Sequence, residues 1–545
     1  MLERAAAIFV FVSLAVNVFA RSEDSSRAVA EAETVYAELR DANSIIGAID
    51  SRLFKSYRGR DRAGWEQVFK QYQKRLKTAL AALPTAGLSV ADERVVGLLK
   101  TRLDALSTGP VSEGSQPRPC ADSTRKDLDY AALRNAMVGC FTALGGSLHF
   151  ENGTVDRGSA LGMLAELDDP SRRKALFYSF IPLWQAINGD DSEASAYRRM
   201  IVMASADAAK NGSEIDAAVR TFGVAPAEVE RWLEQILTLW SEVMPDQPVE
   251  PWDYKYASGA ADRLLAAKIP RESLRPLDER FYRDLGVDLN RLGVLYDIFP
   301  KTGKSSVAYT DFLTYGRTLH GRWTKTIARV SASYAEGGLS SVNELVHENG
   351  HAVHISAIRN RPVFTDWPDD FLTEACADVP SWSVYEPAWQ QKYLGAAAPV
   401  DASLRALYGN VMLDVAWALF ELRMLSDPAA DPNLLWTDIT HRYLHIVAHA
   451  ELSWWALRVQ LVDLPGYMVN YGLGAVLTAE LREKLREEIG AFDAGNRRWY
   501  PYLSDHLLRY GLERPVPELL REFFGRPVTA QALLDQIRRL TPSTH

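Results

Sequence analysis

Two histidines and a glutamate carry the clearest chemical signal, in the stretch Val346-His347-Glu348-Asn349-Gly350-His351. On a helix, His347 and His351 stand four positions apart and point to one side, so their imidazoles can bind one metal ion. Glu348 then lies beside the open coordination position, where it can accept a proton from water. The pattern His-Glu-x-x-His therefore predicts a zinc-type hydrolytic site on a helix, although the pattern by itself also occurs by chance.

A zinc site that keeps one position open for water needs a third protein ligand, and a second helix should supply it. Glu374 follows His347 by 27 residues, and Asp378 stands one helical turn beyond Glu374. Asp378 can accept the second ring N–H of a ligand histidine and thereby fix its tautomer. We expect Zn²⁺ to be held by the two histidines and Glu374, with Asp378 behind them. The alternative interpretation of Glu374 is a solvated carboxylate on a helix.

The composition is that of a folded, globular chain. Hydrophobic residues make up 47% and charged residues 24% of the 545 positions, which excludes a collagenous, low-complexity or largely disordered protein. Lys and Arg number 61 against 70 Asp and Glu, for a net charge of -9. Because no global positive field exists to neutralise phosphates, nucleic acid is not an expected partner.

The first twenty residues have the layout of a signal peptide. Arg4 precedes an apolar run from Ala5 to Val16, and Val18-Phe19-Ala20 fits a cleavage site. We expect residues 1–20 to be removed, which makes the mature chain secreted or periplasmic, with no stable membrane insertion. The apolar run is shorter than the roughly 20 residues that span a membrane. An uncleaved lipid-facing anchor and a buried helix are the alternatives.

The sequence contains three cysteines, Cys120, Cys140 and Cys376. In an oxidising compartment, Cys120 and Cys140 can close a loop of about twenty residues and restrict the unfolded chain. Two unpaired, buried thiols are the alternative. Cys376 follows Glu374 by two positions and points elsewhere on a helix, so we interpret it as buried and inert.

The elements that must position these residues are mostly helices. Apolar residues recur every three or four positions over most of 31–106, 128–244 and 341–540, which is the pattern of amphipathic helices. The convincing strand signals lie within Ser305–Tyr334, notably in Ser306–Thr310 and Thr326–Tyr334. The sequence thus predicts a mainly α fold, with a small β-sheet beside the helix that carries His347.

Further motifs, in the same order along the chain, resemble the thimet oligopeptidase-like (M3) zinc metallopeptidase family. The resemblance covers roughly Pro251 to Leu534 and rests on the histidine motif and on three weaker elements: Pro251-Trp252-Asp253-Tyr254-Lys255-Tyr256, Tyr296-Asp297-Ile298-Phe299-Pro300-Lys301-Thr302-Gly303-Lys304, and Phe524-Gly525-Arg526-Pro527 with Ala532-Leu533-Leu534. It implies a two-lobed, helical zincin peptidase with a deep central cleft. We expect an N-terminal helical region at 21–250 and a catalytic region at 251–545, with interleaved lobes.

The resemblance also implies roles for individual residues. It carries the zinc ligands and the general base over to His347, His351, Glu374 and Glu348. Tyr471 matches a transition-state tyrosine of the family, within Gly466-Tyr467-Met468-Val469-Asn470-Tyr471. Tyr467 is the second candidate for stabilising the oxyanion that forms during peptide hydrolysis.

The chain departs from the family at several positions. Val462 and Gly474 stand where the family places a histidine and a second tyrosine, and Asn349 stands where phenylalanine is usual. The spacing of Glu374 and Asp378 is closer to that of the angiotensin-converting-enzyme-like (M2) relatives. These departures predict a divergent branch whose oxyanion donor is not fixed by the resemblance.

Other histidines have plainer interpretations. His441, His445 and His449 recur every four residues, as on one helix face. We interpret them as a helix with one or two histidines hydrogen-bonded in the cleft wall; a second metal site, or His449 as a substitute oxyanion donor, are the alternatives. His354, seven residues after His347, is interpreted as a packing residue, because a fourth protein ligand would leave no position for water.

Together these features predict a zinc metallopeptidase of the gluzincin type that acts on short peptides. We expect Thr326–Tyr334 to offer an exposed strand edge to which an extended peptide adds by main-chain hydrogen bonds, with Ala332 among the contacts. Internal cutting and dipeptide release are alternatives within this class. The alternative from another class is a catalytically impaired zincin-fold protein that binds peptide or metal, which Val462 and Gly474 favour.

Overall fold

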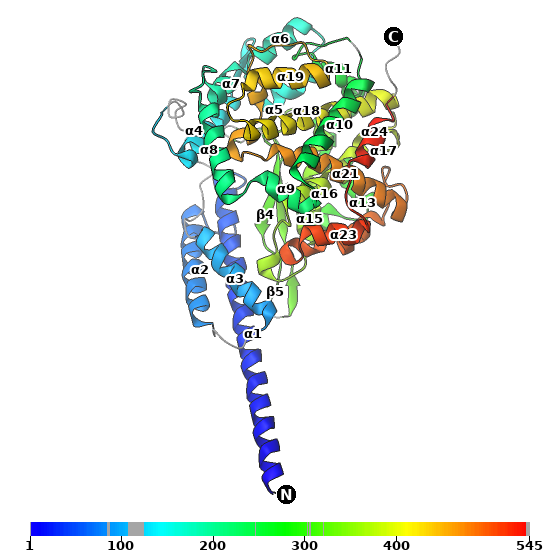
Figure 1. The fold of residues 1–545 in the computed structure, drawn as a ribbon. Coiled ribbons are helices and arrows are strands. Elements are labelled where there is room, and N and C mark those ends of the chain that lie inside the picture. Colours follow the sequence, from blue (N-terminus) through cyan, green and yellow to red (C-terminus); the bar gives the residue numbers. More distant parts are fainter. Residues whose placement is uncertain are drawn as a thin grey trace.

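The computed structural model describes residues 2–83, 88–106, 125–245, 247–301, 304, 307–319 and 321–540. Helices dominate (Figure 1), which confirms the predicted mainly α fold. The first half of the chain contains α1 (Leu2–Asp50), α2 (Arg62–Ala82), α3 (Val90–Ala105), α4 (Tyr130–Gly145), α5 (Arg157–Glu166), α6 (Pro170–Tyr178), α7 (Ile181–Asn188), α8 (Ala196–Asn211), α9 (Glu214–Phe222) and α10 (Pro226–Val243).

The second half contains the helices that surround the histidine motif. They are α11 (Tyr254–Ser258), α12 (Ala260–Leu265), α13 (Leu274–Asp284), α14 (Leu289–Leu292), α15 (Leu339–Ala357), α16 (Asp370–Ser381), α17 (Pro387–Leu394), α18 (Val400–Ser426), α19 (Pro432–Leu444), α20 (Gln460–Asp463), α21 (Met468–Ile489), α22 (Trp499–His506), α23 (Val516–Phe524) and α24 (Gln531–Ile537). Many helices start where an Asp or Ser side chain accepts a hydrogen bond from the first turn, as at Asp61, Ser89, Asp129, Asp156, Ser195, Ser213, Asp369 and Asp431.

The helix α1 is long, and its N-terminal part extends beyond the rest of the molecule (Figure 1). Its C-terminal part packs with α2 and α3 around a small apolar core that includes Tyr36, Leu39 and Phe69. The expected cleavage point after Ala20 lies within α1, and the removal of residues 1–20 stays a prediction. Among the described residues, no helix combines the length and the apolar composition that crossing a membrane requires.

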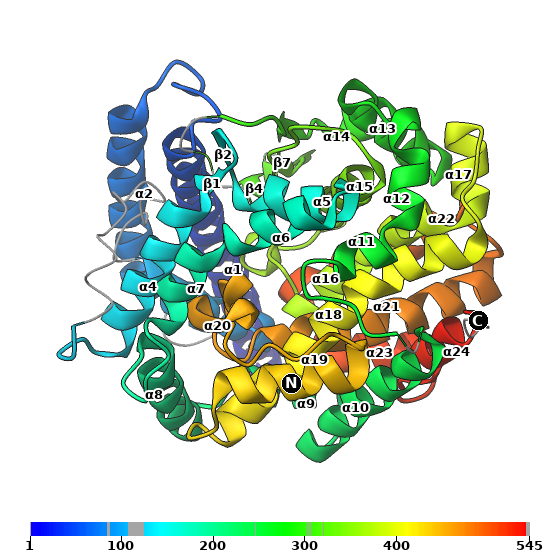
Figure 2. The same cartoon turned by 90° about the horizontal axis from the view of Figure 1, so that it is seen from above.

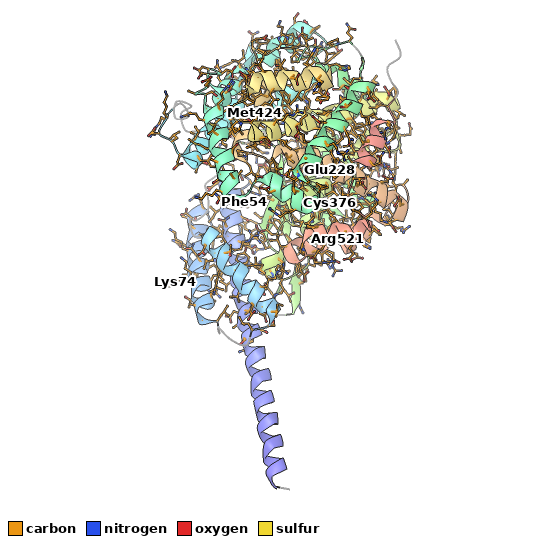
Figure 3. The ribbon with its side chains drawn as sticks, viewed as in Figure 1. Phe54, Lys74, Glu228, Cys376, Met424 and Arg521 are labelled. Atoms are coloured by element: carbon orange, nitrogen blue, oxygen red, sulfur yellow. The ribbon has the colours of Figure 1, made fainter. Side chains whose placement is uncertain are left out.

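The centre of the molecule is formed by α15, α16, α18 and α21, which share one large apolar core. Helix α16 packs against both α15 and α21, and α21 packs against α18 (Figure 2). Side chains fill this region (Figure 3), where Cys376 on α16 is only 2% exposed. Helices on the two sides of position 250 also pack together, as α10 does on α18, while the predicted division into 21–250 and 251–545 stays a prediction.

A three-stranded sheet lies against α15, as the sequence predicted. It contains β3 (Leu295–Asp297), β4 (Tyr309–Thr314) and β7 (Ile327–Ser331), in the order β3-β7-β4. Strand β7 pairs in parallel with β3 and antiparallel with β4. Two further two-stranded sheets pair β1 (Leu148–Phe150) with β2 (Gly153–Val155) and β5 (Arg317–Leu319) with β6 (Arg322–Thr324). Ser306, the first residue of the predicted strand Ser306–Thr310, lies outside the described residues, as does Ser305 at the start of the wider range.

The expectation that Thr326–Tyr334 offers an exposed strand edge is wrong. Strand β7 is the central strand of its sheet, so β3 and β4 already occupy both of its edges. The N–H of Ala332, just beyond β7, donates to the Asp297 carbonyl at 2.9 Å, and the Ala332 carbonyl accepts from Lys304 Nζ. A β-branched run predicts a strand, but strand order depends on pairing between distant segments.

Candidate metal centre and active site

The two helices that carry the predicted ligands approach each other unusually closely. Helix α15 carries His347 and His351, and α16 carries Glu374. A Cβ added to Gly350 would lie 2.7 Å from Ala377 Cα, which is closer than real Cβ atoms come to other atoms. Glycine at position 350 therefore allows α16 to pass directly beside the histidines, and this contact brings the third ligand within reach.

The structure brings His347, His351 and Glu374 together, and one ligand atom from each lies within 4.8 Å of the other two. The two histidine Nε2 atoms are 3.0 Å apart. Glu374 Oε2 lies 3.4 Å from His347 Nε2 and 3.9 Å from His351 Nε2. Three ligand atoms thus converge on one point, as the spacing in the sequence predicted.

The donor set fits a zinc ion. Asp378 Oδ1 lies 2.7 Å from His347 Nδ1, so Nδ1 carries a hydrogen and Nε2 faces the other ligands, where a metal ion would displace its proton. Two imidazole nitrogens and one carboxylate oxygen are the ligands of many catalytic zinc sites, which keep a fourth position open. The Nδ1 atom of His351 is buried and has no hydrogen-bond partner among the described residues. Of the two histidines, His347 is therefore the one held by a carboxylate.

The charges around the two histidines differ. Burial lowers the pKa of His347, but the carboxylates of Asp378 and Glu374 outweigh it and hold the pKa well above its ordinary value. Burial, reinforced by the positive charge on His347, lowers the pKa of His351 well below its ordinary value. His351 is thereby favoured as a neutral imidazole, the form that binds metal.

Glu348 follows His347 on α15 and is only 5% exposed. Its Oε2 atom accepts a hydrogen bond of 2.7 Å from the Thr310 hydroxyl on β4. Burial raises the pKa of Glu348 to about 7, against the opposing effects of the His347 charge and the Thr310 hydrogen bond. The small sheet thus fixes the orientation of the carboxylate that the sequence assigned as general base.

Asn349 belongs to a buried polar network behind α15 that sequence reasoning missed. Its Nδ2 donates to Asp278 Oδ2 at 2.7 Å, and the Tyr296 hydroxyl donates to its Oδ1 at 2.8 Å. Burial raises the pKa of Asp278 well above its ordinary value. The amide at position 349, where the resembled family has phenylalanine, pairs with one oxygen of a carboxyl and with a phenol that the sequence places 71 and 53 residues away. The other oxygen of Asp278 is buried without a partner among the described residues.

Helix α21 borders the candidate ligand Glu374, and it carries Tyr471 in its first turn, while Tyr467 is the residue just before the helix. Burial raises the pKa of Tyr471, and the nearby charge of Glu374 adds to this effect. The ring of Tyr467 lies 5.5 Å from that of Tyr471. A Cβ at Gly474 would lie 3.9 Å from Glu374 Cβ, so the position at which the family has a second tyrosine also faces the ligand.

Gln460 is a further polar side chain near Tyr471 that the sequence reasoning did not find. Its Nε2 lies 3.4 Å from the Tyr471 hydroxyl, and its Oε1 is buried without a partner among the described residues. Val462, where the family has histidine, is fully buried in α20. In the sequence, Gln460 is marked only by its position two residues before Val462. That position does not reveal the contact with Tyr471, because the contact depends on the path of the chain between the two residues.

Among the described residues, the other histidines that the sequence singled out are not part of the group of three converging ligands. Helix α19 ends at Leu444, and His445 has a left-handed backbone, so the predicted single helix face for His441, His445 and His449 is wrong. His441 and His445 each place Nδ1 against a backbone carbonyl. His449 lies between Glu250 and Glu451, which engage both of its ring nitrogens at 2.8 and 2.7 Å. His354 is fully buried beside Trp367, in agreement with a packing role.

The expectation that Cys376 is buried is confirmed. Burial raises the pKa of the Cys376 thiol, which keeps it protonated and unreactive. Cys140 is disulfide-bonded. Cys120, its predicted partner, lies outside the described residues.

Comparisons with known proteins identify the fold. No protein-family model and no curated protein matches the chain. Solved structures do match over almost the whole length. A PZ peptidase A bound to an inhibitor is 15% identical at a TM-score of 0.55, over 93% of this chain and 96% of that one.

Two structures described as oligoendopeptidase F give the same result. One is 16% identical at a TM-score of 0.57, over 93% of this chain and 95% of the other. The second, from Bacillus anthracis, is 13% identical at a TM-score of 0.55, over 92% and 94% of the two chains. At such identities the likeness establishes the fold. The chain therefore has the fold of these oligoendopeptidase structures, and the comparisons give no support to the converting-enzyme-like features.

Proposed function

We propose that this chain is a zinc-dependent metallopeptidase that hydrolyses peptide bonds of short peptides. One observation carries the proposal: His347, His351 and Glu374 converge on one point, with Glu348 next in sequence and held by a hydrogen bond. This arrangement occurs in a fold shared with structures described as oligoendopeptidases and PZ peptidase. The N-terminal sequence further supports a secreted or periplasmic location as part of the proposal.

Each residue of the candidate site has a separate role in peptide-bond hydrolysis. A bound Zn²⁺ supplies Lewis acidity, which brings the pKa of water towards about 7 and polarises a carbonyl. Glu348 takes the proton from the attacking water and delivers it to the nitrogen of the leaving amine. Asp378 holds the proton on His347 Nδ1 and so keeps Nε2 directed at the other ligands. Tyr471 is the first candidate to donate a hydrogen bond to the oxyanion, with Tyr467 second.

The proposal is tested with a peptide library and three proteins: the zinc-loaded wild type, Glu348→Gln, and Glu93→Gln as a matched control on the exposed face of α3. We expect cleavage products from the wild type and from Glu93→Gln, detected by mass spectrometry and abolished by a chelator. Glu348→Gln should bind zinc normally and give no products. Cleavage by Glu348→Gln at the wild-type rate would refute the role of Glu348 as the general base.

The same experiment distinguishes the proposed peptidase from the alternative, a catalytically impaired protein that binds peptide or metal. Its motivation is the absence of the family histidine and second tyrosine at Val462 and Gly474. Stoichiometric zinc binding without any cleavage by the wild type would favour that alternative over the peptidase.

A further inference from the structure

The two histidines of the candidate metal site are held in different ways. Asp378 holds the ring of His347 through a hydrogen bond of 2.7 Å. His351 is buried, and its Nδ1 atom has no hydrogen-bond partner among the described residues. Ligand histidines usually donate their second N–H to a carboxylate, a carbonyl or water. Within the described part of the chain, the contacts that can orient the His351 ring are therefore packing contacts.

An aromatic ring packs against His351 from the segment between α15 and α16. Trp367 stands three positions before the start of α16. The centre of its ring lies 5.6 Å from the centre of the His351 ring, and the two ring planes meet at 69°. This edge-to-face arrangement favours one relative orientation of two aromatic rings. Trp367 can thus restrain the His351 ring without a hydrogen bond.

Two further rings fix the position of Trp367. Phe312 on β4 lies 5.2 Å from the Trp367 ring at 69°, and His354 on α15 lies 5.5 Å away at 74°. Both Phe312 and His354 are buried, where close packing leaves little room for either ring to move. A side chain whose rotamer is locked by packing can in turn hold its neighbour in place.

Asp366, the residue before Trp367, fixes the backbone of this segment. Its Oδ1 accepts a hydrogen bond of 3.0 Å from the Trp367 N–H. Its Oδ2 forms ion pairs with Arg40 on α1 at 3.0 Å and with Arg102 on α3 at 3.5 Å. Arg40 also donates to the Thr365 carbonyl at 2.7 Å. The side chains of Arg40 and Asp366 are only 10% and 19% exposed, so water and salt screen this pair less than a surface pair.

The same arginine reaches the aromatic rings beside Trp367. The guanidinium of Arg40 lies 3.6 Å from the centre of the Tyr315 ring, and that ring stacks on Phe312 at 4.8 Å with the planes 7° apart. A guanidinium over an aromatic ring is an attractive arrangement. An unbroken series of contacts therefore joins α1 to the candidate ligand His351. Such a series transmits orientation only if its members are energetically coupled, which double variants measure.

We propose that Trp367 is the positioning residue of His351, whose imidazole it holds so that Nε2 points at the other two ligand atoms. The ion pair of Arg40 and Asp366 anchors Trp367 from the N-terminal helices. The inference rests on the proposed function, because it concerns the zinc site on which that function depends. Each ligand histidine then has its own support, a carboxylate for His347 and an aromatic ring for His351.

The test measures metal binding to the whole chain, prepared free of metal. Zinc affinity is measured by competition with a chromophoric chelator, and the absorption bands of Co²⁺ bound in place of zinc report the ligand geometry. Trp367→Leu should weaken zinc binding about 10- to 100-fold, the usual effect of losing a contact that orients a ligand, and should shift the Co²⁺ bands. Trp367→Phe keeps an aromatic ring and should retain most of the affinity.

Trp65→Leu is the matched control for the loss of a buried indole. Trp65 lies on α2 in the small core and packs against the Tyr57 ring at 6.2 Å. Its replacement should lower the free energy of unfolding but leave the zinc affinity and the Co²⁺ bands unchanged. Wild-type affinity and wild-type bands in Trp367→Leu would overturn the proposal. An equal loss of affinity in Trp65→Leu would also overturn it, because the loss would then follow from general destabilisation.

The anchor is tested with Asp366→Ala. Its control is Asp50→Ala, because Asp50 forms an ion pair between α1 and α2, with Arg62 at 2.6 Å. Asp366→Ala should weaken zinc binding about 2- to 30-fold, the range for residues that act through others, and Asp50→Ala should not. Asp366→Ala combined with Trp367→Leu should bind zinc as Trp367→Leu alone does, since Asp366 acts through the ring. Losses that add in the double variant would refute the anchoring role.

Failure of this inference and failure of the proposed function give different results. If the wild type binds zinc and cleaves peptides but Trp367→Leu binds zinc equally well, the peptidase stands and the positioning role falls. If Trp367→Leu weakens zinc binding but the zinc-loaded wild type cleaves nothing, the positioning role stands and the catalytic proposal falls. A wild type that binds no zinc would overturn both.

Discussion

The replacement Gly350→Ala tests whether the metal centre depends on the close approach of α15 and α16. The added Cβ would lie 2.7 Å from Ala377 Cα, 3.1 Å from its carbonyl oxygen and 3.2 Å from its Cβ. Carbon atoms pack at about 3.5–4.0 Å, so the helices must separate by about 1 Å at this point. Because backbone atoms face the new methyl group, no change of side-chain rotamer relieves the overlap.

The cost to stability should be modest. Overpacking a core costs about 1–3 kcal/mol, whereas Gly→Ala inside a helix gains about 1 kcal/mol. We therefore expect the free energy of unfolding of the metal-free Gly350→Ala protein to fall by at most about 2 kcal/mol. Gly97 in α3 is the matched control, because a Cβ there meets no atom within 4 Å. Gly97→Ala should keep or raise the stability.

The effect on metal binding should be larger. His347 Nε2 and Glu374 Oε2 are 3.4 Å apart across the two helices, whereas ligand-to-metal distances tolerate only about ±0.2 Å. A separation of about 1 Å should weaken zinc binding about 10- to 100-fold, as the loss of an orienting contact does elsewhere. Zinc affinity is measured by competition with a chromophoric chelator. Unchanged affinity in Gly350→Ala, with a melting temperature raised as in Gly97→Ala, would refute the reasoning.

Three further predictions concern single side chains. Asp378→Asn replaces the carboxylate that holds His347 and should lower zinc affinity about 10- to 100-fold in the same titration; an unaltered affinity would show that the ring is oriented by other contacts. Tyr471→Phe should lower kcat about 100- to 1000-fold with little change in KM, if its hydroxyl stabilises the oxyanion; a kcat equal to that of the wild type would remove it from the mechanism. Burial raises the pKa of Asp493, but Arg482 and Arg486 outweigh burial and hold it at about 2, below the ordinary value of 3.8. Its stabilising contribution of about 2 kcal/mol is therefore present above pH 4 and lost as the pH falls through 2. Urea unfolding of the wild type and Asp493→Asn should show a difference that shrinks between pH 4 and pH 2, and a difference equal at pH 2 and pH 7 would contradict the assignment.

The candidate metal centre was predictable because the spacings that suggest it lie within single helices. Four positions separate His347 from His351 and Glu374 from Asp378, and on any helix that spacing places the two side chains on one face. The helical pattern over 341–540 placed both pairs on helices, although it did not give the bounds of α15 and α16. Only the pairing of these two helices had to be assumed, and Gly350 is the residue that permits it.

Strand order and helix ends followed less well from the sequence. The β-branched residues of β7 indicated a strand, but its central position depends on β3, which lies more than thirty residues upstream. The spacing of His441 and His445 suggested one continuous helix, yet the chain turns at His445, where a left-handed residue ends α19. The periodicity of apolar residues in the sequence indicates which face of a helix or strand is buried. It does not indicate which other segment packs against that face.

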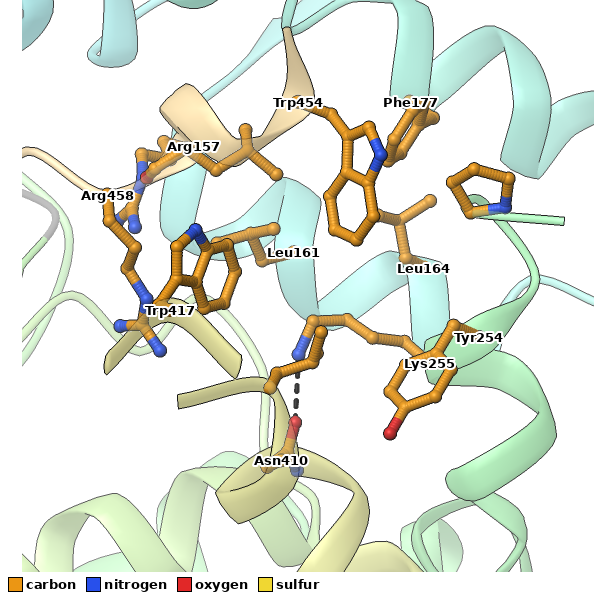
Figure 4. Close-up of a pocket in the computed structure, with 13 residues that line it drawn as sticks. Arg157, Leu161, Leu164, Phe177, Tyr254, Lys255, Asn410, Trp417, Trp454 and Arg458 are labelled. Carbon is orange, nitrogen blue, oxygen red and sulfur yellow. Dashed lines mark hydrogen bonds between the residues drawn. The ribbon is translucent and has the colours of Figure 1, made fainter. Parts of the chain in front are cut away.

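The sequence by itself determined the class of fold and pointed to the three side chains that converge as a candidate metal site, the carboxylate beside them and the aspartate behind them. Tertiary structure alone decided which polar groups complete the site. Asn349 meets Asp278, and Gln460 meets the Tyr471 hydroxyl. Likewise, Arg157, Lys255 and Arg458 come from segments far apart in the chain and share one pocket (Figure 4). Contacts within a helix follow from its fixed period, whereas contacts between distant segments follow from the packing of the whole core, which no short stretch of sequence specifies.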